Sequence, residues 1–346
     1  MSDLVAVLAF VACAAAIFFA GGRLSRYGER IAQLSGWGSA WVGLILMASV
    51  TSLPELVVGV SSSALVGSAD LAVGDVLGSC ALNLLILASL DAFVPARRRL
   101  FALASPSHVL AAALGIVLLA TVGVGLLIDD SLALTPWIGL SSLVFISLYL
   151  GSVRLIFRNG RGLPPDPSVQ PPLDEDLSPG DAVTAGLGLR QVVARYSLYA
   201  GIVVVAAILL PPAAEAIARM SGLEESFVGT VFVALSTSLP ELAVSLAAIR
   251  MGAIDLAVGN ILGSNLFNIL ILAIDDVAYT DGLLLADASP SHLFTVLTTI
   301  AMSAIAIIGL TYPSARGKRF LLAGDAALML VVYAGNAAML LTLSPH

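Results

Sequence analysis

The sequence is poor in charge and in the residues that build soluble catalytic centres. Of its 346 residues, 11% are Asp, Glu, Lys or Arg, only three are His and only two are Cys. No HExxH motif, GxSxG motif or zinc-type Cys/His spacing occurs, which argues against metallohydrolases and serine hydrolases. The net charge of -7 leaves no basic surface to neutralise phosphates, so nucleic acid is excluded as a partner.

Apolar residues take the place of the missing charge. They make up 59% of the chain, and the mean hydropathy is +1.01, which is far too apolar for a water-soluble globule. The first twenty residues contain no Lys or Arg, so they lack the basic region of a cleavable signal peptide and are interpreted as a retained span. We therefore expect a multi-pass integral protein of the cell (inner) membrane, embedded in the lipid bilayer.

Ten apolar runs are long enough to cross about 30 Å of hydrocarbon. They cover residues 4–20, 38–66, 70–95, 107–128, 133–153, 197–218, 224–249, 254–274, 291–311 and 320–343. The second, third, seventh and eighth runs carry Gly, Ser, Asn, Pro or an acid at mid-depth. The predicted fold class is an all-α integral membrane protein of about ten transmembrane helices, with these four Pro/Gly-interrupted helices as its core.

Basic residues predict the orientation, because loops rich in Lys and Arg stay in the cytoplasm. With both termini outside, 15 of the 16 Lys and Arg residues lie on the inner side and only Arg219 lies outside. Acidic residues gather in or beside the outer loops: Asp129, Asp130, Asp275, Asp276, Asp281 and Asp287. We expect both the N-terminus and the C-terminus to be outside.

The two halves of the chain repeat each other. "TSLPEL" at 51–56 returns at 237–242, and "DLAVGDVLGSCALNLLILA" at 70–88 returns as "DLAVGNILGSNLFNILILA" at 255–273. Each half holds five predicted spans, so the second copy enters the membrane from the opposite side and forms an inverted repeat. We predict a first repeat at 1–158 (motif region 46–88), a flexible cytoplasmic linker at 159–190 and a second repeat at 191–346 (motif region 232–273).

A glutamate follows a proline in each copy of TSLPE, in the middle of an apolar run. Because proline has no N–H, Pro54 and Pro240 each leave a helical carbonyl unsatisfied, and such a carbonyl survives in hydrocarbon only beside a cavity, water or an ion. Glu55 and Glu241 have no Lys or Arg at comparable depth, and a buried carboxylate without a positive partner is costly. The expected partner is a bound cation.

Hydroxyl side chains beside the two glutamates extend this candidate cation site. They belong to Thr51, Ser52, Thr237 and Ser238. Together with the carboxylates and the loosened carbonyls, they can supply the roughly six to eight oxygens that Ca²⁺ prefers. The inverted symmetry is expected to bring both glutamates together near the midplane.

The third and eighth spans each carry a polar stripe on one helical face, because its members are four residues apart. The stripes are Asp75, Ser79 and Asn83 in the third span, and Asn260, Ser264 and Asn268 in the eighth. Asp75 is interpreted either as a protonated packing residue or as a proton site. An aspartyl intramembrane protease would need two aspartates at depth, and only Asp75 qualifies. We therefore predict that the protein is not an enzyme.

"TSLPE" with "GDVLGSCALN", and "TSLPE" with "GNILGSNLFN", resemble the signature repeats of the cation/Ca²⁺ exchanger superfamily, and most closely its Na⁺/Ca²⁺ exchanger branch. The resemblance implies a secondary antiporter that exchanges Ca²⁺ for Na⁺ by alternating access, with its ion site at the midplane and no resident cofactor. It also implies the ion ligands. They are Thr51, Ser52, Glu55, Ser79, Asn83, Thr237, Ser238, Glu241, Ser264 and Asn268, with Asp75 as an added candidate.

Some positions depart from the family pattern. Val50 and Ser236 stand where family members usually have Gly, Asn268 where many have Asp, and Asp75 where Asn is usual. The counter-ion therefore stays open between Na⁺ and H⁺, and another divalent cation is an alternative cargo. The TSLPE motif favours Na⁺, because H⁺/Ca²⁺ exchangers resemble "GN" plus Glu instead. Nothing in the sequence predicts the oligomeric state.

Overall fold

The computed structural model describes residues 3–128, 133–160, 186–220, 235–313, 318 and 320–343. The regular elements of this part are helices, apart from an isolated bridge between Ala133 and Gly139. Several predictions lie outside it: most of the linker, the start of the seventh span, Asp129, Asp130, and three of the inner basic residues, Arg161, Arg316 and Arg319.

The chain divides into two compact units. One consists of Met1–Pro54 and Asn159–Asn260, and the other of Glu55–Arg158 and Ile261–His346. Each unit therefore takes helices from both halves of the sequence. Helices α4 and α13 begin in the first unit and continue in the second.

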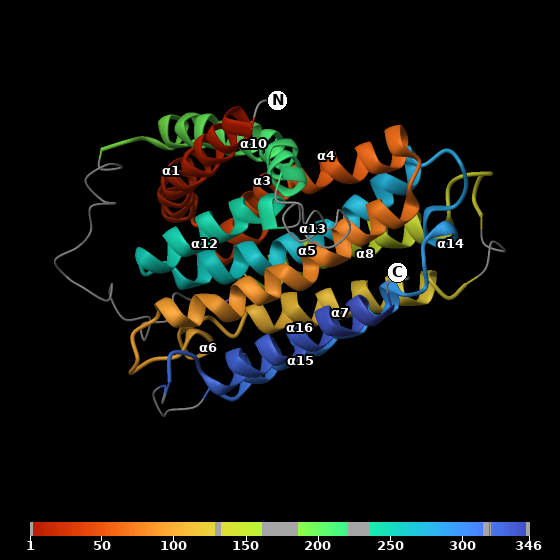
Figure 1. Cartoon of the computed structure of the whole chain (residues 1–346). Coiled ribbons are helices and arrows are strands. Elements are labelled where there is room, and N and C mark those ends of the chain that lie inside the picture. Colours follow the sequence, from red (N-terminus) through yellow and green to blue (C-terminus); the bar gives the residue numbers. More distant parts are fainter. Residues whose placement is uncertain are drawn as a thin grey trace. The chain divides into compact units, whose positions relative to one another are not determined.

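The first unit is built around a long N-terminal helix, α1, which packs along α10 and against α12 (Figure 1). The bounds of these helices are Asp3–Ser35 for α1, Leu189–Met220 for α10 and Leu239–Arg250 for α12. Three short elements follow α1: α2 (Ser39–Trp41), the π-helical segment η1 (Val42–Met47) and α3 (Ala48–Thr51). Buried Ile17, Ala207, Leu210 and Ala243 form an apolar core of this unit, and Phe10 and Leu239 pack against it.

The second unit contains the remaining helices. They are α4 (Leu53–Ser61), the π-helical η2 (Ser62–Val66), α5 (Ala69–Leu90), the 3₁₀ turn η3 (Asp91–Phe93), α6 (Leu100–Leu103), α7 (His108–Gly125), α8 (Leu140–Gly160), α13 (Ile254–Ala278), α14 (Leu284–Asp287), α15 (His292–Thr311) and α16 (Gly324–Leu343). Helix α15 packs against α5, α7 and α16. Lys318, between α15 and α16, pairs with Asp91 at 3.7 Å, and both side chains are only 2% exposed.

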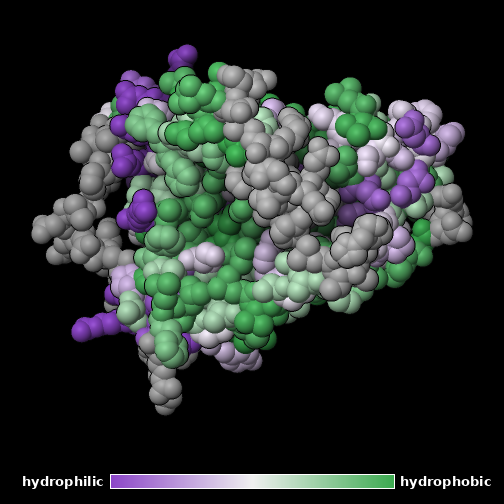
Figure 2. Space-filling view, in the orientation of Figure 1, coloured by the Kyte–Doolittle hydropathy of each residue, from purple (hydrophilic) through white to green (hydrophobic). Residues whose placement is uncertain are grey.

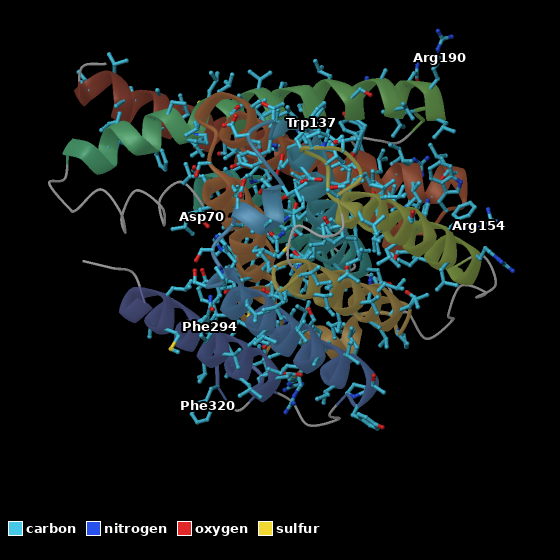
Figure 3. All side chains as sticks on the ribbon, turned by 90° about the vertical axis from the view of Figure 1, so that its right-hand side faces the viewer. Asp70, Trp137, Arg154, Arg190, Phe294 and Phe320 are labelled. Atoms are coloured by element: carbon cyan, nitrogen blue, oxygen red, sulfur yellow. The ribbon has the colours of Figure 1, made fainter. Side chains whose placement is uncertain are left out.

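Eight helices of the described part are long and apolar enough to cross a membrane. They match predicted spans one to six, eight and nine, while Gly324–Leu340 is a shorter apolar helix at the tenth and α12 covers the described end of the seventh. Large apolar side chains remain exposed on these helices, and Figure 2 shows them covering much of the visible face. Phe294 and Phe320 point outward in Figure 3. Such a surface is suited to lipid and not to water.

Two predicted helix ends were wrong. Helix α1 continues to Ser35, so Arg23, Arg26 and Arg30 lie on a helix and not in a loop. Arginine stems extend along an apolar surface while the guanidinium reaches water, so a helix can continue past the hydrocarbon. Helix α13 continues to Ala278, which places Asp275 and Asp276 inside it, both buried, and not in an outer loop.

Candidate ion-binding site

Both TSLPE motifs interrupt a helix in the same way. Helix α4 begins directly after Ser52, and α12 begins directly after Ser238. The backbone angles at the two interruptions are nearly equal, with φ -90° and ψ 7° at Ser52 and φ -86° and ψ 3° at Ser238. Pro54 and Pro240 then fall in the first turn of the following helix, where a missing N–H has no cost. The predicted interruption is confirmed in both copies of this motif, but the third and eighth spans, which were predicted to be interrupted as well, form the continuous helices α5 and α13.

Glu55 and Glu241 lie in the first turns of α4 and α12, and both side chains are 0% exposed. The positive end of a helix dipole stabilises an anion there by about 1 kcal/mol, and by about 2 kcal/mol in favourable buried geometry. Burying a charged group costs several kcal/mol. The helix ends therefore offset only a small part of the cost of these carboxylates.

Side chains from both motif regions touch in the first unit. Ser52 Oγ donates a hydrogen bond to Glu241 Oε1 at 3.3 Å, and Thr51 Oγ1 donates one to Asn260 Oδ1 at 3.3 Å. All four side chains are 0% exposed. The structure therefore brings two predicted ligands of the first repeat beside polar groups of the second.

Two further predicted ligands of this unit, Thr237 and Ser238, are also buried. Ser238 Oγ has no hydrogen-bond partner among the described residues. Leaving a buried hydroxyl unsatisfied costs about 1–3 kcal/mol. An ion or a water molecule at this oxygen would remove that cost.

In the second unit, α5 and α13 meet through amide side chains. Asn83 Nδ2 donates to Asn265 Oδ1 at 3.1 Å, and Asn265 Nδ2 donates to the Cys80 carbonyl at 3.1 Å. Cys80 and Asn265 occupy equivalent positions in the two repeats, so their contact marks where the repeat axis passes through this unit. Sequence reasoning missed Asn265, because it lies outside the predicted polar stripe of its helix and its counterpart in the first repeat is a cysteine.

The remaining predicted ligands lie on the helices of this unit. Glu55, Ser79, Ser264 and Asn268 are fully buried, and Asp75 is half-buried. Ser79 Oγ and Asn83 Oδ1 have no hydrogen-bond partner among the described residues. Helix α5 therefore offers two buried oxygen atoms that are available to an ion.

This set of side chains suits a hard cation. Its donors are carboxylate, hydroxyl and amide oxygens, which are the ligands that Ca²⁺ prefers. Across the described residues, no three His, Cys, Asp or Glu side chains gather into a metal centre. The donor set therefore differs from that of a zinc or iron site. The role of each side chain as an ion ligand stays a prediction.

Sequence reasoning also missed Asp275 as a buried residue, because it placed this acid in or beside an outer loop. The side chain is 0% exposed, and α13 continues for three residues beyond it. A comparison of "LILASLD" with "LILAIDD" would have found it, because Asp275 stands where the first repeat has Leu90.

Comparison with protein families matches residues 5–158 and 192–342 to the family described as sodium/calcium exchanger protein. The chain is 32% identical to inner membrane protein YrbG of Escherichia coli over 238 residues, which is 67% of this chain and 66% of YrbG. It is 32% identical to the putative antiporter CaxA of Alkalimonas amylolytica over 235 residues, or 66% of each chain. The match thus spans about two thirds of these relatives' length.

A shorter match joins the chain to the sodium/calcium exchanger MaX1 of Methanosarcina acetivorans, with 41% identity over 92 residues, which is 26% of this chain and 25% of MaX1. Among solved structures, the sodium-calcium exchanger NCX_Mj soaked without Na⁺ and Ca²⁺ aligns over 97% of this chain and 99% of its own. Its TM-score is 0.71 at 22% identity, so the two proteins share a fold.

Proposed function

Because the chain belongs to the sodium/calcium exchanger protein family, we propose that it exchanges Ca²⁺ for Na⁺ across the membrane by alternating access. The protein is a multi-pass membrane antiporter of the cation/Ca²⁺ exchanger family, which is a family of transporters and not of enzymes.

The observation that carries the proposal is the buried contact between Ser52 Oγ and Glu241 Oε1 in the first unit. It joins a hydroxyl of one TSLPE copy to the carboxylate of the other, and both groups are of the type that binds Ca²⁺. Inverted repeats of this kind hold their ion site at the midplane, between interrupted helices. The matching interruptions at Ser52 and Ser238 support the same location.

We assign the charged ligands to Glu55 and Glu241, because two carboxylates neutralise one Ca²⁺. The neutral oxygens are assigned to Thr51, Ser52, Ser79, Asn83, Thr237, Ser238, Ser264 and Asn268. When Ca²⁺ leaves, the same two carboxylates must again be neutralised, because their exposure to the low dielectric of the membrane is costly. Monovalent cations that enter in its place meet this need, so the two cargoes exclude each other and are exchanged.

Na⁺ is supported as the counter-ion by the relatives. The names of MaX1 and NCX_Mj describe sodium/calcium exchange. Exchange for H⁺, or transport of another divalent cation, is the alternative.

Proteoliposomes loaded with Ca²⁺ test the proposal. An imposed Na⁺ gradient should drive Ca²⁺ efflux, whereas an imposed pH gradient should not. Glu55→Gln and Glu241→Gln should each lower the initial efflux rate by roughly 100-fold or more, because each removes a charged ligand. Ser61→Ala is the matched control on α4, since the Ser61 hydroxyl donates only to the Val57 carbonyl of its own helix.

Undiminished exchange by either glutamine variant would defeat the ligand assignment. Efflux driven by the pH gradient and not by Na⁺ would replace Na⁺ with H⁺.

A further inference from the structure

Asp275 is a buried acid without a role in the exchange site. Its side chain is 0% exposed, and neither Oδ1 nor Oδ2 has a hydrogen-bond partner among the described residues. The ion pairs recorded in this part of the chain join His292 to Asp70 and Lys318 to Asp91, and none involves Asp275. Because an uncompensated buried carboxylate costs several kcal/mol, its isolation points to a ligand.

The Asp275 carboxylate packs against Gly59 of α4. A Cβ added to Gly59 would lie 2.7 Å from Asp275 Oδ1, so the carboxylate occupies the space that a larger residue would fill. The charge of Asp75 is near enough to act on Asp275, and Asp75 Oδ2 also has no hydrogen-bond partner among the described residues. Two acids of this unit therefore interact electrostatically, and each has a carboxylate oxygen without a hydrogen-bond donor in the described part of the chain.

The repeat provides an internal comparison for this arrangement. Where the first copy has Gly59 and Asp75, the second has Ser245 and Asn260. There, Asn260 Nδ2 donates to Ser245 Oγ at 3.1 Å, which makes a neutral and satisfied pair. The second copy thus has a neutral pair at these positions, whereas the first has an acid and a glycine whose missing side chain leaves space that the Asp275 carboxylate fills.

The neighbouring Asp276 shows how a structural acid in this region is satisfied. Its Oδ2 accepts from the Gly139 N–H at 2.9 Å, and its Oδ1 accepts from the Leu284 N–H at 3.2 Å. Asp275 has no such donors among the described residues, and its counterpart in the first repeat is the buried Leu90. An apolar side chain can therefore fill the equivalent position of the fold, and packing there does not require a carboxylate.

We propose that Asp75 and Asp275 form a second divalent-cation site in this unit, separate from the exchange site. The two carboxylates match the charge of one divalent cation, and the absence of a side chain at Gly59 leaves room for the Asp275 carboxylate between the helices. Ser63, four residues after Gly59, is also buried, and its Oγ has no hydrogen-bond partner in the described part of the chain. Water completes the oxygen shell, as is common for Ca²⁺.

The position of the site defines its use. Asp75 precedes Ser79 by four residues and Asp275 follows Asn268 by seven, so the pair lies about 6 Å along α5 and about 10 Å along α13 from these predicted ligands, at 1.5 Å per residue. A cation entering from that end of the helices meets Asp75 and Asp275 first. We therefore describe it as a staging site, and both this role and the choice of Ca²⁺ as its ligand rest on the proposed function.

Equilibrium binding tests the site without transport. Purified protein in lipid nanodiscs is dialysed against radioactive Ca²⁺ in Na⁺-free buffer. We expect two Ca²⁺ per unmodified chain, one for Glu241→Gln, and none for Glu241→Gln combined with Asp275→Asn, whose remaining affinity should fall by roughly 100-fold. Asp281→Asn in the Glu241→Gln background removes an exposed acid from the next loop and should keep one bound Ca²⁺.

Asp75→Asn, which installs the residue that the second repeat has at this position, should abolish the remaining binding as Asp275→Asn does. It replaces Asp275→Asn if that variant is not monodisperse. The proposal is overturned if Glu241→Gln alone removes all Ca²⁺ binding, if neither Asp variant weakens the remaining site, or if that site takes Na⁺ and not Ca²⁺. The exchange assignment fails by a different result, namely Ca²⁺ transport that survives Glu241→Gln.

Discussion

Asp91 and Asp276 stand at equivalent positions of the two repeats and accept backbone N–H groups in the same way. Asp91 Oδ1 accepts from the Leu100 N–H at 2.8 Å, and Asp276 Oδ1 accepts from the Leu284 N–H at 3.2 Å. Leu100 and Leu284 are also equivalent in the repeat. Each acid therefore holds, through this hydrogen bond, the segment that follows a long helix. We infer a structural role for a buried carboxylate that accepts hydrogen bonds from backbone N–H groups in this way.

Asp276→Asn should destabilise the protein by about 1–3 kcal/mol. Both carboxylate oxygens accept hydrogen bonds, from Gly139, Ser142 and Leu284. An asparagine side chain would replace one of these acceptor oxygens with an NH₂ group, which is itself a donor and would face other donors. The midpoint of thermal unfolding in detergent should fall. Asp281→Asn removes the same charge from an exposed position and should leave the midpoint unchanged; an equal fall in both variants would mean that charge, and not hydrogen bonding, sets the effect.

Close helix contacts depend on particular glycines. In the first unit, a Cβ on Gly259 of α13 would lie 2.6 Å from the Ala40 carbonyl oxygen and 3.1 Å from the Leu44 nitrogen. In the second unit, a Cβ on Gly78 of α5 would have no heavy atom within 4 Å. The glycines look alike in sequence, but only Gly259 is required by a backbone approach.

Gly259→Ala should cost about 1–3 kcal/mol, because backbone atoms cannot move aside as a flexible side chain can. Gly78→Ala is the matched control, and it should be neutral or stabilise the helix by up to about 1 kcal/mol through helix propensity. Thermal unfolding of the two variants measures the difference. Equal midpoints for both would show that the η1–α13 contact is looser than described.

Basic residues predict which side of the membrane each loop of the chain faces. Arg154 on α8 and Arg190 on α10 project outward from their helices (Figure 3). On the positive-inside rule, the segment after α8 lies in the cytoplasm and the C-terminus lies outside. This orientation stays a prediction.

Fusions to alkaline phosphatase, which is active only outside the cytoplasm, measure the orientation. A fusion after His346 should be active, and a fusion after Arg158 should be inactive, because fifteen of sixteen basic residues lie on the predicted inner side. The reverse pattern would invert the topology without changing the fold.

Much of the architecture follows from the sequence alone. A bilayer offers no water to a backbone carbonyl or a carboxylate, so the apolar runs had to be helices, and the Pro-Glu pairs had to mark interruptions and buried acids. The structure confirms the interruptions at Ser52 and Ser238 and the burial of Glu55 and Glu241. These features depend on the chain and its solvent, and not on which helices become neighbours.

The tertiary structure decided which polar groups are satisfied. Asp275 and Asp276 are neighbouring aspartates, yet within the described part of the chain only Asp276 accepts hydrogen bonds from backbone N–H groups. Asn265 became an interhelical partner of Asn83 because α5 and α13 approach there, and the π-helical segments η1 and η2 left no sequence signal. A hydrogen bond between helices depends on the packing of residues that are distant in the chain, so no local sequence pattern predicts it. By contrast, a segment in hydrocarbon must be apolar and must satisfy its own backbone hydrogen bonds, and both requirements can be recognised in the segment itself.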